Sequence, residues 1–398
     1  MRRSVKRRVL AVLLLLLPLA TAIPAGAVLP GESPADTYGV NGKVRSIVVV
    51  DDTVWVGGAF TAVTNGNSTS SIGAADGLVA FSRTTGKLAT GVAVPKLTGS
   101  NIEVWKLVTD GLRVWAAGKF SYNGTSKRNL ISFNGLTGGN VTTYDGVPLS
   151  KSVAVGDKVY VGGTQVSAWP LGGGSKLSGF VPLTLKESIG GHESIAAMRD
   201  MLVDGSDVYG ACQCSAVIQG GATTSVNSLI RFSAGDGALD KPFSTRVPGQ
   251  VGEGSFGLGI AGDDSGVYLA AGGSDYVAKF NFDGTERWHT DTSGSAQALT
   301  LTTDEDQLVV GGHFQWVEVP GVSQCGSNQN PNKNCASRLR LMAVDPGTGV
   351  VLGWNPGACC QYNGLWATTA DGSSIHIGGS FTKVHNEAQT FYARLGAT

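Results

Sequence analysis

Charged side chains are scarce in this sequence of 398 residues, at 15%, and its 30 acidic residues balance its 30 basic residues. A neutral chain lacks the excess of positive charge with which proteins bind nucleic acid or an anionic membrane surface. After the first 27 residues, no segment is apolar enough to span a bilayer. We therefore expect no nucleic-acid partner and no membrane span.

The motifs of common enzymes and metal sites are also missing. The five histidines include no His-x-x-x-His pair, and no Gly-x-Ser-x-Gly elbow occurs. The Asp-rich turns lack the alternating acidic ligands of a calcium loop. These absences favour a protein without metal or cofactor, and a binding protein over an enzyme.

The N-terminus has the pattern of a targeting segment. Five basic residues lie between positions 2 and 8, an apolar, Leu-rich run covers positions 9–20, and Ala25-Gly26-Ala27 follows. The apolar run is shorter than the roughly 20 residues that cross a bilayer. This pattern predicts a secretory signal peptide at residues 1–27 and a mature domain at 28–398, secreted or held at the cell surface. An uncleaved membrane anchor is the alternative.

One pattern recurs along the mature chain: two or three β-forming residues, a pair of small residues and often a Phe. The copies begin at residues 54, 114, 159, 208, 267, 308 and 375, and their spacing runs from 41 to 67 residues. Such a period is typical of the blades of a β-propeller, which are four-stranded sheets joined by loops of variable length. The copy at 208 is degraded.

Each copy lies in the same local context. A turn rich in Asp and Gly precedes it, such as Asp51-Asp52 or Asp371-Gly372, with another strand before the turn and a further strand after a variable loop. The seventh unit lacks a fourth strand, which residues 36–40 can supply. The sequence therefore predicts an all-β, seven-bladed β-propeller of four-stranded blades, closed by an N-terminal strand near Tyr38 that pairs beside Tyr392.

The copies at 54–60, 114–120, 308–314 and 375–381, each followed by a strand of the form Leu/Val-x-x-Phe/Val-Asp/Asn, resemble the delta-60-type repeat propellers of secreted bacterial proteins. The resemblance covers essentially the whole mature chain. It implies the propeller fold and no particular activity, because that family is largely a domain of unknown function.

Six cysteines remain in the mature chain, and an even number in an exported protein indicates disulfides. They are Cys212, Cys214, Cys325, Cys335, Cys359 and Cys360. Cys325 and Cys335 lie ten residues apart in one loop that contains Gly, Asn and Pro, so we expect them to pair. The pairing of the other four stays open; all six fall in connections on the same face of the predicted propeller.

That face carries the long, irregular loops, where function concentrates on a rigid scaffold. Four aromatic residues near it suit contact with a protein or a glycan, namely Trp316, Trp354, Tyr362 and Trp366. The polar candidates nearer the axis are His192, Glu193 and Asp200. The favoured interpretation is a monomeric binding module. The alternatives are an extracellular hydrolase or quinoprotein-like oxidoreductase with its site at the channel mouth, and a structural scaffold.

Aligning the innermost strands at a fixed distance before each copy places seven residues at one level of the central channel. They are Arg45, Trp105, Ser150, Arg199, Leu258, Leu299 and Trp366, and the next level holds Ser46, Lys106, Lys151, Asp200, Gly259, Thr300 and Ala367. Charged residues on inner strands are costly unless they are hydrated or paired. A water-filled channel and a ligand site both account for them.

The signal-peptide pattern makes a direct prediction. Mass spectrometry of the exported protein should find a mature N-terminus at Val28, because signal peptidase reads the small residues at positions 25 and 27. Replacing Ala27 by Glu should block this cleavage. An exported wild-type chain that keeps residues 1–27 would contradict the prediction.

Overall fold

The computed structural model describes residues 29–126, 128–186, 196–247, 256–322, 325–332, 334–361 and 363–396. The regular structure of these residues consists almost entirely of β-strands, which confirms the all-β prediction. The one α-helix among them, α1 (Lys241–Arg246), is short and begins where Asp240 accepts a hydrogen bond from Phe243 N. No helix in the described part of the chain has the length and apolar character needed to cross a membrane.

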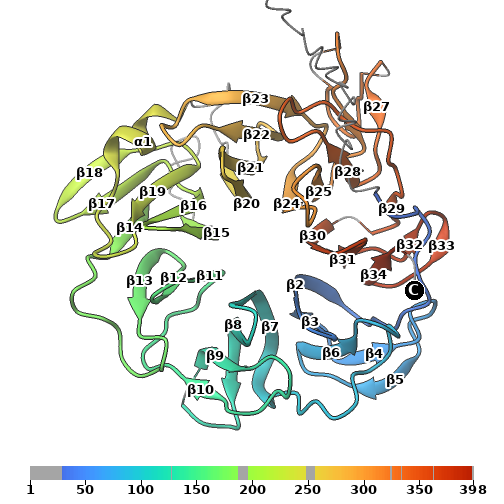
Figure 1. Cartoon of the computed structure of the whole chain (residues 1–398), viewed down its shortest axis with the longest axis horizontal. Helices are drawn as coiled ribbons and strands as arrows, with labels where there is room; N and C mark the ends of the chain where they lie inside the picture. The colour runs from blue at the N-terminus through green and yellow to red at the C-terminus, as the bar shows by residue number, and fades with distance from the viewer. Residues whose placement is uncertain are drawn as a thin grey trace, which may run out of the picture.

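Seven sheets follow one another in chain order around a central opening (Figure 1). The first four, from the innermost strand outward, are β2 (Lys43–Val50), β3 (Thr53–Ala59) and β6 (Leu78–Ser82); β7 (Leu97–Thr109), β8 (Arg113–Tyr122), β9 (Arg128–Asn134) and β10 (Thr142–Thr143); β11 (Ser152–Val155), β12 (Val159–Gly162), β13 (Gln165–Trp169) and β14 (Leu183–Lys186); β15 (Ala197–Asp204), β16 (Asp207–Gln213) and β19 (Leu229–Ser233).

The remaining three sheets complete the circuit and bring the last sheet beside the first, where β2 contacts β30 and β31. They are β20 (Phe256–Asp263), β21 (Gly266–Gly272), β22 (Tyr276–Phe280) and β23 (Glu286–Asp291); β24 (Ala296–Leu301), β25 (Leu308–Gly312) and β28 (Leu341–Val344); β30 (Gly364–Asp371), β31 (Ser374–Ser380) and β34 (Tyr392–Leu395). All strand pairs within these sheets are antiparallel.

The expectation of four strands per sheet holds only in part. In three sheets the fourth strand is reduced to one bridge, between Phe81 and Leu88, Phe232 and Leu239, or Val344 and Val351. The strand pairs that remain lie nearest the axis, where two neighbouring sheets cover them. The outermost position has a neighbour on one side only, and little packing holds a full strand there.

The N-terminal segment pairs with the last sheet, but at a different position from the one predicted. Ala35 N donates to Arg394 O at 2.8 Å, beside a bridge between Pro34 and Leu395. Tyr38 instead donates its N–H to Gly86 O in the first sheet. The prediction placed the contact a few residues too late because β1 (Gly39–Val40) is taken by a hairpin that the sequence analysis treated as loop.

That hairpin belongs to a set of short strands in the long loops. They are β4 (Ala62–Thr64) and β5 (Ser71–Ala74), which pair with β1; β17 (Ala216–Gln219) and β18 (Ala222–Ser225), which extend the sheet of β14; β26 (Trp316–Val317) and β27 (Ala336–Ser337); and β29 (Ala358–Cys359), β32 (Lys383–Val384) and β33 (Glu387–Ala388). They satisfy backbone groups that a bare loop would leave to water.

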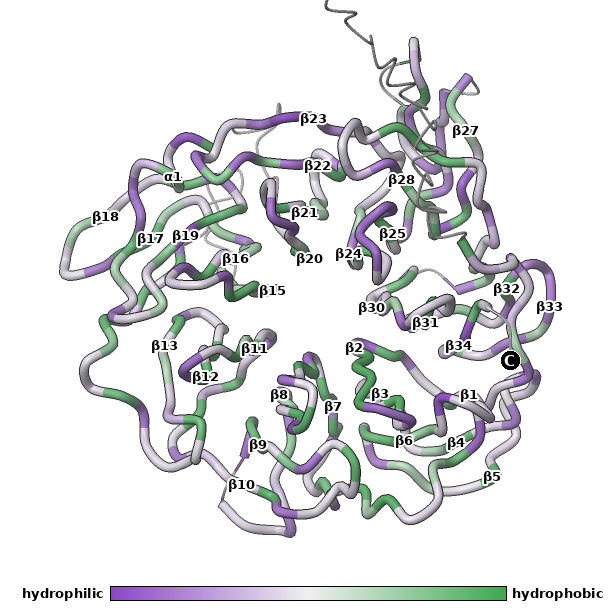
Figure 2. The backbone as a smooth tube through the Cα atoms, in the orientation of Figure 1, coloured by the Kyte–Doolittle hydropathy of each residue, from purple (hydrophilic) through white to green (hydrophobic). Residues whose placement is uncertain are grey.

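The core consists of apolar layers between neighbouring sheets, and hydrophobic stretches alternate with hydrophilic ones along the chain (Figure 2). Small residues let these layers close. A Cβ added at Gly57 would lie 2.7 Å from Val104 of the next sheet, and one at Gly378 would lie 2.3 Å from Val44. The recurring small pair is therefore a packing requirement at the boundary between two sheets.

His376 lies buried near the junction of the last sheet with the first and stands where most other copies of the repeat carry Trp or Tyr. Its side chain is 0% exposed, with Nδ1 2.9 Å from Tyr392 Oη and Nε2 3.6 Å from Asp371 Oδ2. Burial lowers the pKa of His376, against the opposing effect of Asp371. The fold therefore favours the neutral imidazole.

This burial predicts that acid weakens the fold. The unfolded chain binds a proton at His376 near pH 6.5 and the folded chain does so only at lower pH, so the free energy of unfolding falls as pH drops from 7 to 5. The group contributes a slope of at most about 1.4 kcal/mol per pH unit. Urea unfolding at several pH values should show a shallower slope for His376→Gln. The same slope in wild type and variant would contradict this account, and exposed His385→Gln is the control.

Candidate functional site

The innermost strands share an irregularity that turns one residue of each toward the axis. In six of the seven described pairs of inner strands, the register shifts by one residue. The extra residue at each shift is Arg45, Trp105, Arg199, Leu258, Gln297 or Trp366. A β-bulge of this kind redirects a side chain that regular alternation would place elsewhere.

In the third sheet, the pairing of β11 with β12 does not extend past this level, yet one residue still occupies the equivalent position. Pairing begins at Ser152 opposite Gly162, and Lys151 N also donates to Gly162 O at 3.0 Å. Lys151 therefore takes the position of the bulged residues. We call these seven residues the axial ring; all of them line a central cavity of 690 Å³.

The sequence alignment placed five members of the axial ring correctly and two wrongly. It chose Ser150 and Leu299, whereas the structure places Lys151 and Gln297 there. The error lies in the turns: three residues separate Val155 from its partner Val159, and six separate Leu301 from Leu308, against four between Val49 and Val54. A fixed spacing fails because turn length varies while strand pairing is conserved from sheet to sheet.

The cavity carries more positive than negative charge, although the whole chain is neutral. Arg45 Nε lies 2.7 Å from Glu103 Oε1, and Lys106 Nζ lies 2.6 Å from Asp200 Oδ1. Lys151 and Arg199 add two further cations to the lining. Among the described residues that line the cavity, four are basic and two are acidic.

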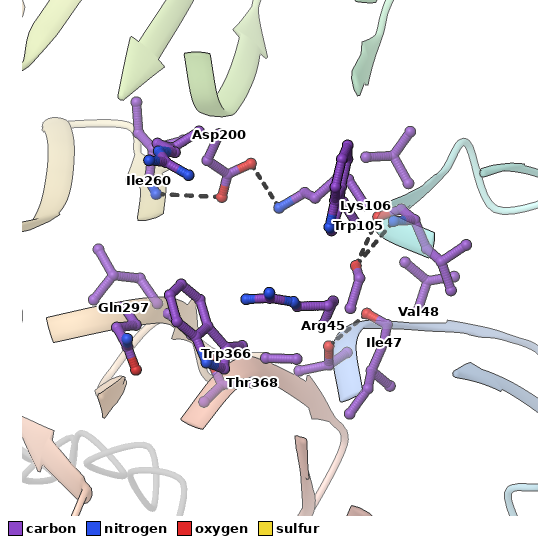
Figure 3. Close-up of a pocket in the computed structure, with 18 of the residues that line it drawn as sticks. Arg45, Ile47, Val48, Trp105, Lys106, Asp200, Ile260, Gln297, Trp366 and Thr368 are labelled. Carbon is purple, nitrogen blue, oxygen red and sulfur yellow. Dashed lines mark hydrogen bonds and ion pairs between the residues drawn. The ribbon is translucent and has the colours of Figure 1, made fainter. Parts of the chain in front are cut away.

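Two tryptophans accompany these cations. The Arg45 guanidinium lies 4.6 Å from the centre of the Trp366 ring, and Lys151 Nζ lies 6.0 Å from that of Trp105. Figure 3 shows Arg45 extending into the space between the two indoles. Both tryptophans are half-buried and line the cavity. The site combines flat apolar surfaces with positive charge.

Lys151 is the cation most available to a ligand. It has no ion pair among the described residues, and its ammonium group lies over the Trp105 ring. Burial lowers the pKa of its ammonium group, and the positive charges of Arg199 and Arg45 lower it further, against the opposing effect of Glu103. An anion placed beside Lys151 would favour the charged ammonium and so raise its pKa again.

Asp200, a predicted site residue, lies in the cavity but is fully engaged. Besides its pair with Lys106 it accepts hydrogen bonds from Met201 N at 2.9 Å and Ile260 N at 3.4 Å. These contacts tie β15 to β7 and β20, and they describe a structural carboxylate. The other polar candidates, His192 and Glu193, lie outside the described residues.

The four predicted aromatic residues do not gather in one exposed patch. Trp354 is 7% exposed and donates Nε1–H to Pro30 O at 2.8 Å, so its burial corrects its assignment to an exposed surface. Trp316 is half-buried in β26, and Trp366 lies in the cavity. Tyr362 falls outside the described residues. Sequence reasoning missed Gln297 and Glu103. An alignment based on which residue of the innermost strand pairs with the small residues of the next strand would have located them.

The cysteines form three pairs. The predicted pair Cys325–Cys335 is confirmed, with an S–S distance of 2.07 Å. The other two join residues close in sequence, Cys212 with Cys214 and Cys359 with Cys360. The described part of the chain contains no cluster of three or more His, Cys, Asp or Glu residues that could hold a metal ion.

Comparison with known proteins places the fold and little else. Neither a protein-family model nor a curated protein matches the sequence, so the resemblance to delta-60-type repeats stays a prediction. The computationally designed Ika8 protein aligns over 92% of this chain and 100% of its own, at 15% identity and a TM-score of 0.51. The WD40 β-propeller domain of Doa1 aligns over 87% and 94%, at 11% identity and a TM-score of 0.36. The chain thus shares its fold with the designed protein.

Lys106 and Asp200 should show measurable energetic coupling because both side chains are largely buried. A double-mutant cycle with Lys106→Met and Asp200→Asn should give a coupling free energy of about 1 to 2 kcal/mol in urea unfolding. The exposed pair Lys87–Asp36, at 2.9 Å, is the matched control and should give less than about 0.5 kcal/mol. Equal coupling in the two pairs would refute the structural role of Asp200.

Proposed function

We propose that this chain is an exported, single-domain, seven-bladed β-propeller that acts as a binding module, and that its ligand is an anion held in the central cavity. The observation that carries the proposal is the axial ring. It turns Arg45, Lys151 and Arg199 toward one space together with two indole rings. Groups from separate sheets converge there, as in small-molecule sites.

Export is supported by the signal-peptide pattern and by three cysteine pairs, because disulfides persist in oxidising compartments. The propeller assignment is supported by the repeat and by seven sheets in chain order around one axis. The cavity replaces the aromatic loop face as the favoured ligand site, because Trp366 lies in the cavity and Trp354 is buried.

The geometry favours binding over catalysis. Among the described residues that line the cavity, the carboxylates are Glu103 and Asp200, and both are held in ion pairs with cations. A general base needs a carboxylate free to accept a proton from a substrate. Lys151, in contrast, has no ion pair among the described residues and is suited to holding negative charge.

The proposal can be tested with pyrenetetrasulfonate, a flat and highly anionic ring whose fluorescence reports binding. We expect it to bind the wild-type protein and to bind Lys151→Met about 10- to 100-fold more weakly, because one charged contact is lost in a partly buried site. Lys87→Met removes an exposed lysine outside the cavity and should bind as the wild type does.

Two results would contradict the proposed site. If Lys151→Met and Lys87→Met bind the probe equally, the cavity is not where anions bind. If the wild-type protein does not bind the probe, the excess of positive charge in the cavity does not form an anion site.

A further inference from the structure

We propose that the disulfide Cys359–Cys360 is a site of thiol–disulfide exchange, which an external dithiol reduces and a disulfide oxidant restores. The inference goes beyond the anion site in the cavity and does not depend on it. Three features of the pair carry it: the exposure of its cysteines, their adjacent positions in the chain, and the backbone conformation of Cys360.

Exposure separates this pair from the other two disulfides. The four cysteines of those disulfides are 0 to 5% exposed, whereas Cys360 is exposed and Cys359 is half-buried. An attacking thiolate must reach one of the two sulfur atoms, so access limits the rate of exchange. Among the three disulfides, Cys359–Cys360 is therefore the one that an external thiol can attack without prior opening of the fold.

Adjacent positions make this bond of little use for stability. In the chain-entropy account, a disulfide stabilises a fold by restricting the unfolded chain, and its effect grows with the number of residues that it encloses. The Cys325–Cys335 bond spans ten positions and restrains a long loop, whereas the Cys359–Cys360 bond spans one and encloses no further residue. The protein can therefore lose and regain the Cys359–Cys360 bond while the fold is kept.

The backbone at Cys360 gives the bond a structural consequence. The φ of Cys360 is 84°, in the left-handed region that suits glycine and is unfavourable for a residue with a side chain. Its neighbour Cys359 lies at the end of β29, pairs with Lys383 of β32 and accepts a hydrogen bond from Thr382 N at 3.0 Å. Reduction frees Cys360 to leave this φ, and the contact between β29 and β32 beside it should then loosen.

The exchange balances in atoms and electrons. A thiolate of the external dithiol attacks Cys360 Sγ and forms a mixed disulfide, while the electron pair of the broken S–S bond leaves with Cys359 Sγ, which takes up a proton. The second thiolate of the dithiol then attacks the dithiol's own sulfur in the mixed disulfide and releases Cys360 as a thiol. The protein gains two electrons and two protons, and the dithiol becomes a disulfide.

Timed labelling of the full mature protein tests the proposal. The oxidised protein is treated with dithiothreitol under native conditions, free thiols are trapped with N-ethylmaleimide at successive times, and mass spectrometry locates the label. We expect Cys359 and Cys360 to be labelled at least about tenfold faster than Cys325 and Cys335, because only the first pair offers an accessible sulfur.

Two variants and one structural measurement complete the test. The double variant Cys359→Ser/Cys360→Ser should lose the fast labelling, and its melting temperature should fall by less than about 2 °C. The matched control Cys325→Ser/Cys335→Ser should keep the fast labelling and melt at a lower temperature than the first variant. In the wild-type protein, reduction should speed hydrogen exchange of the Thr382 amide and leave that of a distant hairpin, β4–β5, unchanged.

Three results would contradict the proposal. The first is an exported protein whose Cys359 and Cys360 carry free thiols before any reductant is added. The second is labelling that appears first at another cysteine, or at all six together, which would mean that reduction requires unfolding of the chain. The third is unchanged hydrogen exchange at Thr382 after reduction. None of these results bears on the binding of pyrenetetrasulfonate, so this inference and the proposed function can fail separately.

Discussion

The close approach of neighbouring sheets at the axis is the constraint on which the rest of this structure depends. Sheets that meet around one axis have least room at their inner strands, so the second strand of each needs a small residue where the next sheet touches it. Gly57 against Val104 and Gly378 against Val44 show the contact at two boundaries. Without it, the apolar layers between the sheets would not close.

The same crowding explains how a neutral chain forms a charged site. The side chains between neighbouring sheets are apolar, and a bulge in six of the seven described inner strands turns one residue toward the axis instead. Charges that are sparse along the sequence are thereby brought to one place. Arg45, Lys151 and Arg199 are far apart in the chain and share one cavity.

Much of the fold could be predicted from the sequence because the packing constraint leaves a repeated trace in it. The small pair, the Asp-Gly turn and the β-forming residues before them identify the inner two strands of each sheet. The outer strands leave no such trace, since one bridge such as Phe81–Leu88 needs no special residue. The N-terminal pairing was misplaced because the loop hairpin of β4 and β5, which takes up Gly39 and Val40, is weakly patterned.

The site was harder to predict than the fold for a related reason. Which residue belongs to the axial ring depends on how the two innermost strands pair. Because the turn between these strands varies in length, that residue does not lie at a fixed distance in the sequence, as Lys151 and Gln297 illustrate. The aromatic candidates failed differently. Trp354 in a long connection was taken for a surface residue, but the N-terminal segment covers it and accepts its N–H at Pro30. Nothing local in the sequence reveals a contact between segments so far apart.

The electrostatics of the cavity argue that its charge is retained for a ligand rather than for stability. Ion pairs in partly buried places roughly balance their own desolvation cost, so Arg45–Glu103 and Lys106–Asp200 explain why those four residues are tolerated. They do not explain Lys151, whose ammonium is disfavoured both by burial and by Arg199 and Arg45. A methionine of similar length would fill the same space without that cost. The position of Lys151 therefore supports the proposal that an anion binds beside it in the cavity.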